Sequence, residues 1–77
     1  MNKARRQELY DVINLLEEAS GRLEEIQNDE QDAFDNLPES LQYSTRGDSM
    51  QEAIDTMETW NNEIASTIQK ITDYAKK

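Results

Sequence analysis

The sequence predicts an all-α protein: an antiparallel hairpin of two long amphipathic helices that assembles into a multi-helix bundle as a homo-oligomer, either a dimer or a tetramer. Two long segments have apolar residues at intervals of three and four, the segment between them holds the only proline, and charged residues make up 32% of the chain. So short a chain has room for one domain, which we expect to span residues 1–77.

The first helix is expected over about residues 3–35. Its apolar residues form a stripe with heptad spacing, interrupted by one glutamate: Leu9, Val12, Leu16, Ala19, Leu23, Ile26, Glu30 and Ala33. Three further apolar residues flank the stripe: Ile13, Leu15 and Phe34. The widened stripe exceeds what one neighbouring helix covers, so it indicates that several hairpins associate. Gly21 is the weak point of this helix, since glycine costs about 1 kcal/mol there relative to alanine.

The second helix is expected over about residues 49–76. Ser49 is followed three residues later by Glu52, which is the pattern of a capping box at a helix start. Its apolar stripe again has three-and-four spacing: Met50, Ala53, Ile54, Met57, Trp60, Ile64, Ile68, Ile71 and either Tyr74 or Ala75. Core packing explains most of this stripe. Its aromatic members Trp60 and Tyr74 also suit an interface between copies, where they supply large buried area.

Residues 36–48 are expected to form the hinge. Pro38 disfavours helical backbone at Leu37, and residues 38–41 have the pattern of a short helical turn. We expect Gly47 to take a positive φ just before the second helix. A connection of this length is usually functional or ordered by a partner.

The chain is strongly acidic, with 17 acidic and 8 basic residues and a net charge of −9. This charge disfavours binding to DNA, RNA and anionic membrane surfaces. Most of the cations lie near the two ends of the chain: Lys3, Arg5, Arg6, Lys70, Lys76 and Lys77. An antiparallel hairpin gathers them at one pole, where they either offset local electrostatics or form a second anion site.

Catalysis and metal binding are not expected. The chain has no histidine and no cysteine, the commonest general base, metal ligand and nucleophile among side chains. The acidic segment 29–35 lacks the spacing of a calcium loop, because Phe34 and Ser40 stand where such a loop needs glycine and glutamate. We therefore expect a solvated acidic face, and neither a metal nor a cofactor.

We expect a cytoplasmic protein. The longest apolar run is far shorter than the roughly 20 residues needed to cross a bilayer. The basic start of the chain is not followed by the apolar region of a secretory signal.

The hinge permits two interpretations. In the first, Arg46 forms an ion pair with the first helix near Glu30 and offsets the carboxylates crowded at that helix end. In the second, the hinge binds an anionic, nucleotide-like ligand at the start of the second helix, where free N–H groups and the helix dipole favour phosphate. Arg46 would then bind phosphate and Tyr43 would stack on a base. The ligand-binding residues expected in that case are Asn36, Tyr43, Ser44, Thr45 and Arg46.

Residues 33–42, AFDNLPESLQ, together with Ser44, Arg46 and Gly47, resemble the hinge of a family of small acidic helical hairpins from phages and prophages of Gram-positive bacteria. The resemblance covers the hinge well and the helices only by pattern, and Asp48 follows the glycine where a glutamate is typical of the family. In size and all-α form the chain is also similar to viral nucleotide sponges, which sequester the cyclic nucleotide signals of antiphage systems such as CBASS and Thoeris.

The hinge resemblance implies a phage-encoded protein in the host cytoplasm, and the similarity to nucleotide sponges implies an anti-defence role. The protein would bind a cyclic di- or oligonucleotide, or a signal of the cyclic ADP-ribose type, without turnover. The pockets would lie between subunits, where hinges of neighbouring hairpins face one another. Three alternatives remain open: an acidic coiled-coil adaptor, a nucleic-acid-mimicking inhibitor of a host protein, and a purely structural assembly protein.

Overall fold

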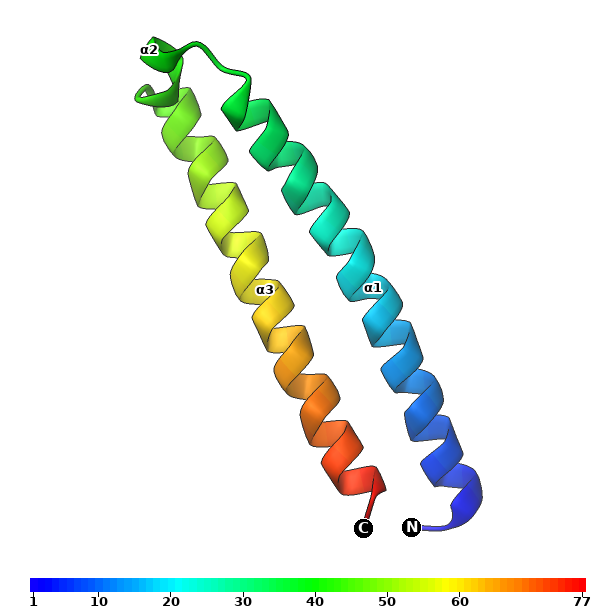
Figure 1. Cartoon of the computed structure of the whole chain (residues 1–77). Coiled ribbons are helices and arrows are strands. Elements are labelled where there is room, and N and C mark those ends of the chain that lie inside the picture. Colours follow the sequence, from blue (N-terminus) through cyan, green and yellow to red (C-terminus); the bar gives the residue numbers. More distant parts are fainter.

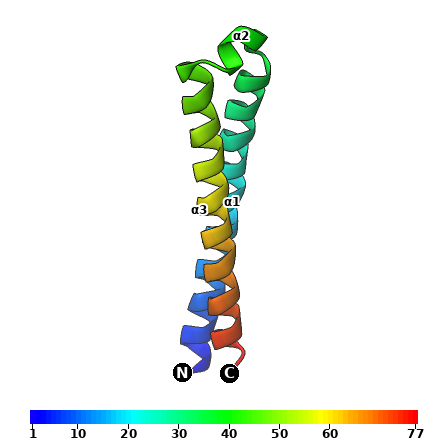
Figure 2. The same cartoon turned by 90° about the vertical axis from the view of Figure 1, so that its left-hand side faces the viewer.

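The computed structural model describes all 77 residues as a single helical hairpin (Figure 1). Its helices are α1 (Lys3–Asp35), α2 (Glu39–Gln42) and α3 (Thr45–Ala75). α1 and α3 lie side by side in opposite directions, with α2 at one end of the rod and both termini at the other (Figure 2). The rod measures 58 × 15 × 12 Å. The predicted all-α class and the hairpin are thereby confirmed, while assembly with other copies stays a prediction.

α1 begins and ends close to where the sequence predicts. Asn2 is its N-cap, and the Asn2 side chain accepts a hydrogen bond of 2.8 Å from the Arg5 N–H. At the other end Asn36 is the C-cap, and its backbone N–H donates to the Asp32 carbonyl oxygen. Pro38 has no N–H to continue this ladder, which explains why the helix does not extend through the hinge.

α3 begins at Thr45, so the predicted start at residue 49 and the predicted hinge over 36–48 are wrong. Ser44, not Ser49, is the N-cap, and its Oγ accepts a hydrogen bond of 3.4 Å from the Gly47 N–H. The connection therefore covers only residues 36–44. It includes α2, which confirms the short helical turn expected at 38–41 with a shift of one residue.

Gly47 lies inside α3 and is buried, and no glycine of the chain has a positive φ. The prediction of a positive φ at Gly47 is therefore wrong. A Cβ at this position would overlap the carbonyl oxygen of Gln42 and lie 2.7 Å from that of Leu41. The glycine is needed because the first turn of α3 packs directly against the backbone of α2.

The two long helices meet along a seam whose members are buried or half-buried at alternating intervals of three and four. On α1 the seam consists of Leu9, Ile13, Leu16, Ser20, Leu23, Gln27, Glu30 and Phe34. On α3 it consists of Gly47, Met50, Ile54, Met57, Asn61, Ile64, Ile68, Ile71 and Ala75. Only five of the 77 residues are buried, all of them in this seam, and no large side chain is fully enclosed, so a single hairpin has almost no enclosed core.

The seam of α1 differs from the predicted stripe. Leu9, Leu16, Leu23 and Glu30 belong to both. The other members differ, because steps of three and then four residues fit the sequence as well as steps of four and then three. Four residues of the predicted stripe are exposed instead: Val12, Ala19, Ile26 and Ala33. On α3, likewise, Trp60 and Tyr74 lie outside the seam with exposed fractions of 50% and 57%.

Neither long helix combines the length and apolar content required to cross a membrane.

Candidate functional site

The five residues expected to bind a ligand all lie at the hinge end of the rod (Figure 1). Asn36 ends α1, and Tyr43 to Arg46 run from the end of α2 into the first turn of α3. Ser44 is half-buried, whereas the other four are exposed, Tyr43 most of all with an exposed fraction of 81%. The hairpin thus brings the predicted residues to one pole but does not enclose them in a pocket.

Ser44 has a structural role at this pole. Its hydroxyl donates to the Leu41 carbonyl oxygen and accepts from the Gly47 N–H, so both hydrogen-bonding functions are in use. A ligand phosphate would have to displace these bonds to use the same hydroxyl. The exposed groups that stay available for a ligand are the Arg46 guanidinium, the Thr45 hydroxyl, the Tyr43 ring and the Asn36 side-chain amide.

Gln42 joins the hinge to α1, a role that the sequence did not predict. Its Nε2 donates to the carbonyl oxygens of Phe34 at 3.3 Å and Leu37 at 3.2 Å. The Phe34 carbonyl oxygen, in the last turn of α1, also accepts from the Leu37 N–H at 3.1 Å, so Gln42 adds a second, side-chain donor there and one to the hinge residue Leu37. Gln42 therefore performs the anchoring that one interpretation gave to Arg46, which is exposed. Gln42 follows Leu37 by five residues and comes just after the turn at Pro38. This spacing was the one feature of the sequence that could have indicated a contact back to the end of α1.

The charge of the chain is concentrated in the hinge half of the rod. Residues 21–60 hold eleven acidic and two basic side chains, a net charge of −9. The remaining residues, which form the half with the termini, hold six acidic and six basic side chains and are neutral overall. An anionic ligand at the hinge therefore meets repulsion that Arg46 and the helix dipole alone must overcome.

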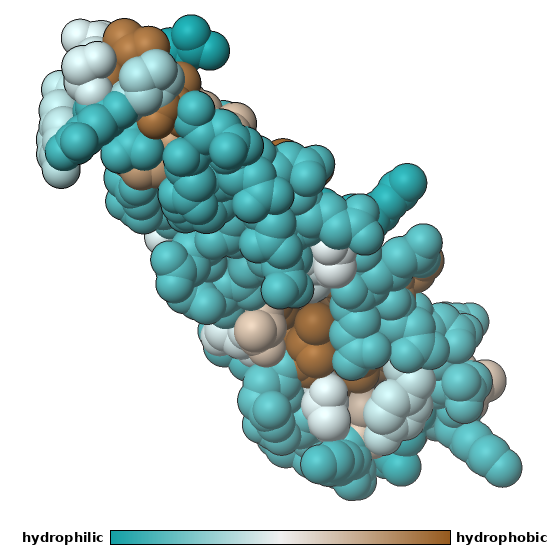
Figure 3. Space-filling view, turned by 45° about the horizontal axis from the view of Figure 1, so that its top comes forward, coloured by the Kyte–Doolittle hydropathy of each residue, from teal (hydrophilic) through white to brown (hydrophobic).

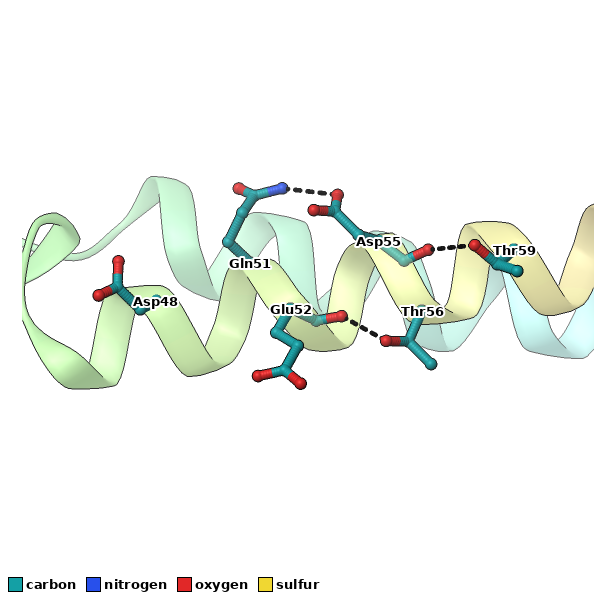
Figure 4. Close-up of a pocket in the computed structure, with 6 residues that line it drawn as sticks. All are labelled: Asp48, Gln51, Glu52, Asp55, Thr56 and Thr59. Atoms are coloured by element: carbon teal, nitrogen blue, oxygen red, sulfur yellow. Dashed lines mark hydrogen bonds between the residues drawn. The ribbon is translucent and has the colours of Figure 1, made fainter.

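A shallow depression of about 400 Å³ lies on the exposed side of α3, close to the hinge (Figure 4). Its lining is entirely polar: Asp48, Gln51, Glu52, Asp55, Thr56 and Thr59. The Gln51 amide donates to the Asp55 carboxylate at 3.0 Å, and the Thr56 hydroxyl donates to the Glu52 carbonyl oxygen at 2.7 Å. The three carboxylates are spaced along one helix, and no group of three or more acidic side chains is close enough to hold a metal ion.

A second depression of about 430 Å³ lies further along α3 beside Trp60. Half of its lining residues are apolar: Ala53, Met57 and Trp60. The others are Ser49, Glu52 and Thr56. Neither depression includes any of the five residues expected to bind a ligand.

Comparison with known proteins identifies no relative of this hairpin: no protein-family model matches the chain, and neither a curated protein nor a solved structure matches it.

Proposed function

We propose that this chain is a non-catalytic binding protein that works as a homo-oligomer and sequesters an anionic, nucleotide-type ligand at its hinge end. The resemblance of its hinge to proteins of phages and prophages suggests a phage origin, and its similarity in size and all-α form to viral nucleotide sponges suggests that the protein counters host defence by binding a cyclic nucleotide immune signal. Sequestration requires no nucleophile and no general base, in keeping with a sequence free of histidine and cysteine.

The observation that supports this proposal most is the exposure of Tyr43. Tyr43 has an exposed fraction of 81% in a chain that has few apolar groups to spare for its core. Arg46 is three residues away, in the first turn of α3. An exposed ring suits stacking on a nucleobase, and a guanidinium beside a helix N-terminus suits a phosphate.

The test is a thermal-shift and calorimetry panel of cyclic dinucleotides, cyclic ADP-ribose isomers and mononucleotides. A ligand that binds only the folded protein stabilises it by about 2.7 kcal/mol at 100 times its Kd, which raises Tm measurably. Tyr43→Ala and Arg46→Ala should abolish the shift. Arg22→Ala is the matched control, because Arg22 is the other cation of the hinge half and lies on exposed α1 surface. Unchanged melting with every nucleotide would remove this proposal.

A second candidate, an acidic inhibitor that imitates nucleic acid, is favoured by the confinement of the net charge to residues 21–60. Asp48, Glu52 and Asp55 line the polar depression of α3 and present part of this charge on one exposed side (Figure 4). Such a surface would attract a basic protein at rates that fall with ionic strength.

Neutralising these three carboxylates, as D48N/E52Q/D55N, should weaken capture of a basic host protein. The matched control neutralises three carboxylates of the neutral half, as D11N/E17Q/E18Q. Equal capture by both triple variants and the unaltered chain would contradict the inhibitor.

A further inference from the structure

The hairpin has one apolar flank that no part of the chain covers. In each helix, four exposed or half-buried residues form a set that repeats every seven positions, directly before every second seam residue. Because α1 and α3 run in opposite directions, these two sets lie on the same flank of the hairpin, which we call the outer face. On α1 they are Val12, Ala19, Ile26 and Ala33, and on α3 they are Ala53, Trp60, Thr67 and Tyr74.

The opposite flank is different in character. It is formed by the residues that directly follow a seam residue: Tyr10, Glu17, Glu24 and Gln31 on α1, and Gln51, Glu58, Ala65 and Thr72 on α3. Three are carboxylates and three are polar without charge, whereas seven of the eight outer-face residues are apolar or aromatic. Apolar surface is therefore gathered on one side of the rod, as in a helix pair that packs against a further pair.

The outer face is shaped to receive side chains. The depression lined by Ala53, Met57 and Trp60 opens on it. Leu15, three residues after Val12 on the same side of α1, protrudes with an exposed fraction of 65%. On the side of the rod drawn in Figure 3, hydrophobic residues reach a mostly hydrophilic surface at the hinge end and again further along the rod. Protruding residues and a groove on one face allow a copy of the chain to fit against itself.

The exposed area matches what such a contact would bury. The chain exposes 5817 Å², whereas a folded monomer of 9.0 kDa exposes about 4,850 Å² by the usual scaling of area with mass. The excess of roughly 950 Å² is close to the approximately 800 Å² that each partner buries in a stable interface.

The charge distribution along the rod favours one relative orientation of the two copies. Two copies aligned in the same direction would bring together two halves that each carry −9. Two copies in opposite directions separate these halves and place each beside the neutral half of the other copy, where six cations lie near the termini. We infer that the outer face binds a second copy of this chain in an antiparallel two-fold dimer, a four-helix bundle with one hinge at each end.

The antiparallel dimer would also change the surroundings of a ligand at the hinge. This second inference rests on the proposed function, whereas the dimer does not. Each hinge would lie next to the basic terminal pole of the other copy. An anionic ligand held by Arg46 would then gain positive charge that one hairpin lacks, which offsets the carboxylates around the hinge. The hinges would accordingly face terminal poles and not one another.

Two alanines provide a matched test of the face. Ala19 lies on the outer face and Ala65 on the opposite flank, and both are exposed in the hairpin, so Ala19→Glu and Ala65→Glu make the same chemical change without a core defect. Sedimentation at micromolar concentration should show a dimer for the unaltered chain and for Ala65→Glu. Ala19→Glu should raise the dimer Kd at least about tenfold, because its carboxylate would be buried against apolar groups. A monomeric unaltered chain, or equal dimerisation of both variants, would overturn the assignment.

A single spin label tests the orientation. The chain has no cysteine, so Ser40→Cys places one nitroxide on exposed α2 at the hinge. In the antiparallel dimer the two labels should be separated by a distance near the 58 Å length of the rod. A short distance, with labels adjacent, would exclude this orientation. If the dimer and its long distance are observed while no nucleotide binds, the proposed function fails and the interface stands. Nucleotide binding by a monomer would overturn the interface and the oligomeric part of the proposed function, and would leave only the nucleotide site standing.

Discussion

Ser20 Oγ donates a hydrogen bond to Asn61 Oδ1 at 2.9 Å, and this bond joins the two long helices within their seam. Both residues occupy positions where an apolar residue would otherwise pack. A polar pair in such a seam lowers stability but favours one alignment of the helices over others, because any shifted register leaves the two groups without partners.

Ser20→Ala should lower the free energy of unfolding by about 1 kcal/mol, since it leaves the half-buried Asn61 amide without this partner. Replacing both residues, as Ser20→Ala with Asn61→Leu, should restore or exceed the original stability because no polar group is then stranded. Urea denaturation measures both effects. Ser66→Ala on exposed α3 surface is the control, with a change within about 0.5 kcal/mol. A double variant as unstable as Ser20→Ala alone would contradict this account of the polar pair.

Gly21→Ala should raise the free energy of unfolding by about 1 kcal/mol. A Cβ at Gly21 meets nothing within 4 Å, so the variant gains the helix propensity of alanine without any steric cost. The gain would appear as a higher midpoint of denaturation at an unchanged denaturant slope. A loss of stability would instead mean that this position contacts something the single hairpin lacks.

Gly47→Ala should lower the free energy of unfolding, although it offers the same gain in helix propensity as Gly21→Ala. Its Cβ would overlap the Gln42 carbonyl oxygen, a backbone atom that cannot move without displacing α2. We expect a loss of at least about 1 kcal/mol, typical of a substitution that overpacks a close contact. The same denaturation experiment, run beside Gly21→Ala, separates packing from propensity. Equal stabilisation by both alanines would refute the close approach.

Ser44→Ala should destabilise the chain by about 1 kcal/mol through loss of the α3 N-cap, while Ser49→Ala should change stability little. The pair distinguishes the observed start of α3 at Thr45 from the start at Ser49 that the sequence predicts. Thermal unfolding followed by circular dichroism is sufficient for the comparison. The reverse order of effects would support a helix that begins at Ser49.

Gln42→Ala should lower the free energy of unfolding by about 1 kcal/mol, because the Leu37 carbonyl oxygen loses its side-chain donor and the Phe34 carbonyl oxygen keeps only backbone donors. Gln69→Ala is its control: Gln69 also donates from Nε2, but to Asp73 on the exposed surface of one helix. That exposed pair should contribute only a few tenths of a kcal/mol. Similar losses for both glutamines would exclude a special role for the hinge amide.

The sequence predicted the helices better than their contacts. α1 ends where predicted because Pro38 forbids its continuation, a constraint that is local and therefore visible in the sequence. The start of α3 was misplaced because Ser44 and Ser49 are both suitable caps. The choice between them depends on the packing of Gly47 against Gln42, which is a tertiary contact.

The seam of α1 was misassigned for a related reason. Val12 and Ile13 both continue a three-and-four pattern from Leu9, and helix geometry does not distinguish them. The structure buries Ile13 to 6% exposure and leaves Val12 at 42%. At the hinge, the fold explains why Tyr43 and Arg46 are exposed. A ligand there stays a prediction, because binding depends on molecules other than this single chain.

The seven-residue repeat of the seam makes the length of the rod adjustable only in fixed steps. Deleting one full repeat from α1 and one from α3 at the same level would shorten the rod by about 10 Å and leave every other seam residue facing its counterpart. Deleting three or four residues from α1 alone would instead rotate all later residues of that helix out of the contact. Insertions and deletions in this hairpin are therefore tolerated only as matched pairs.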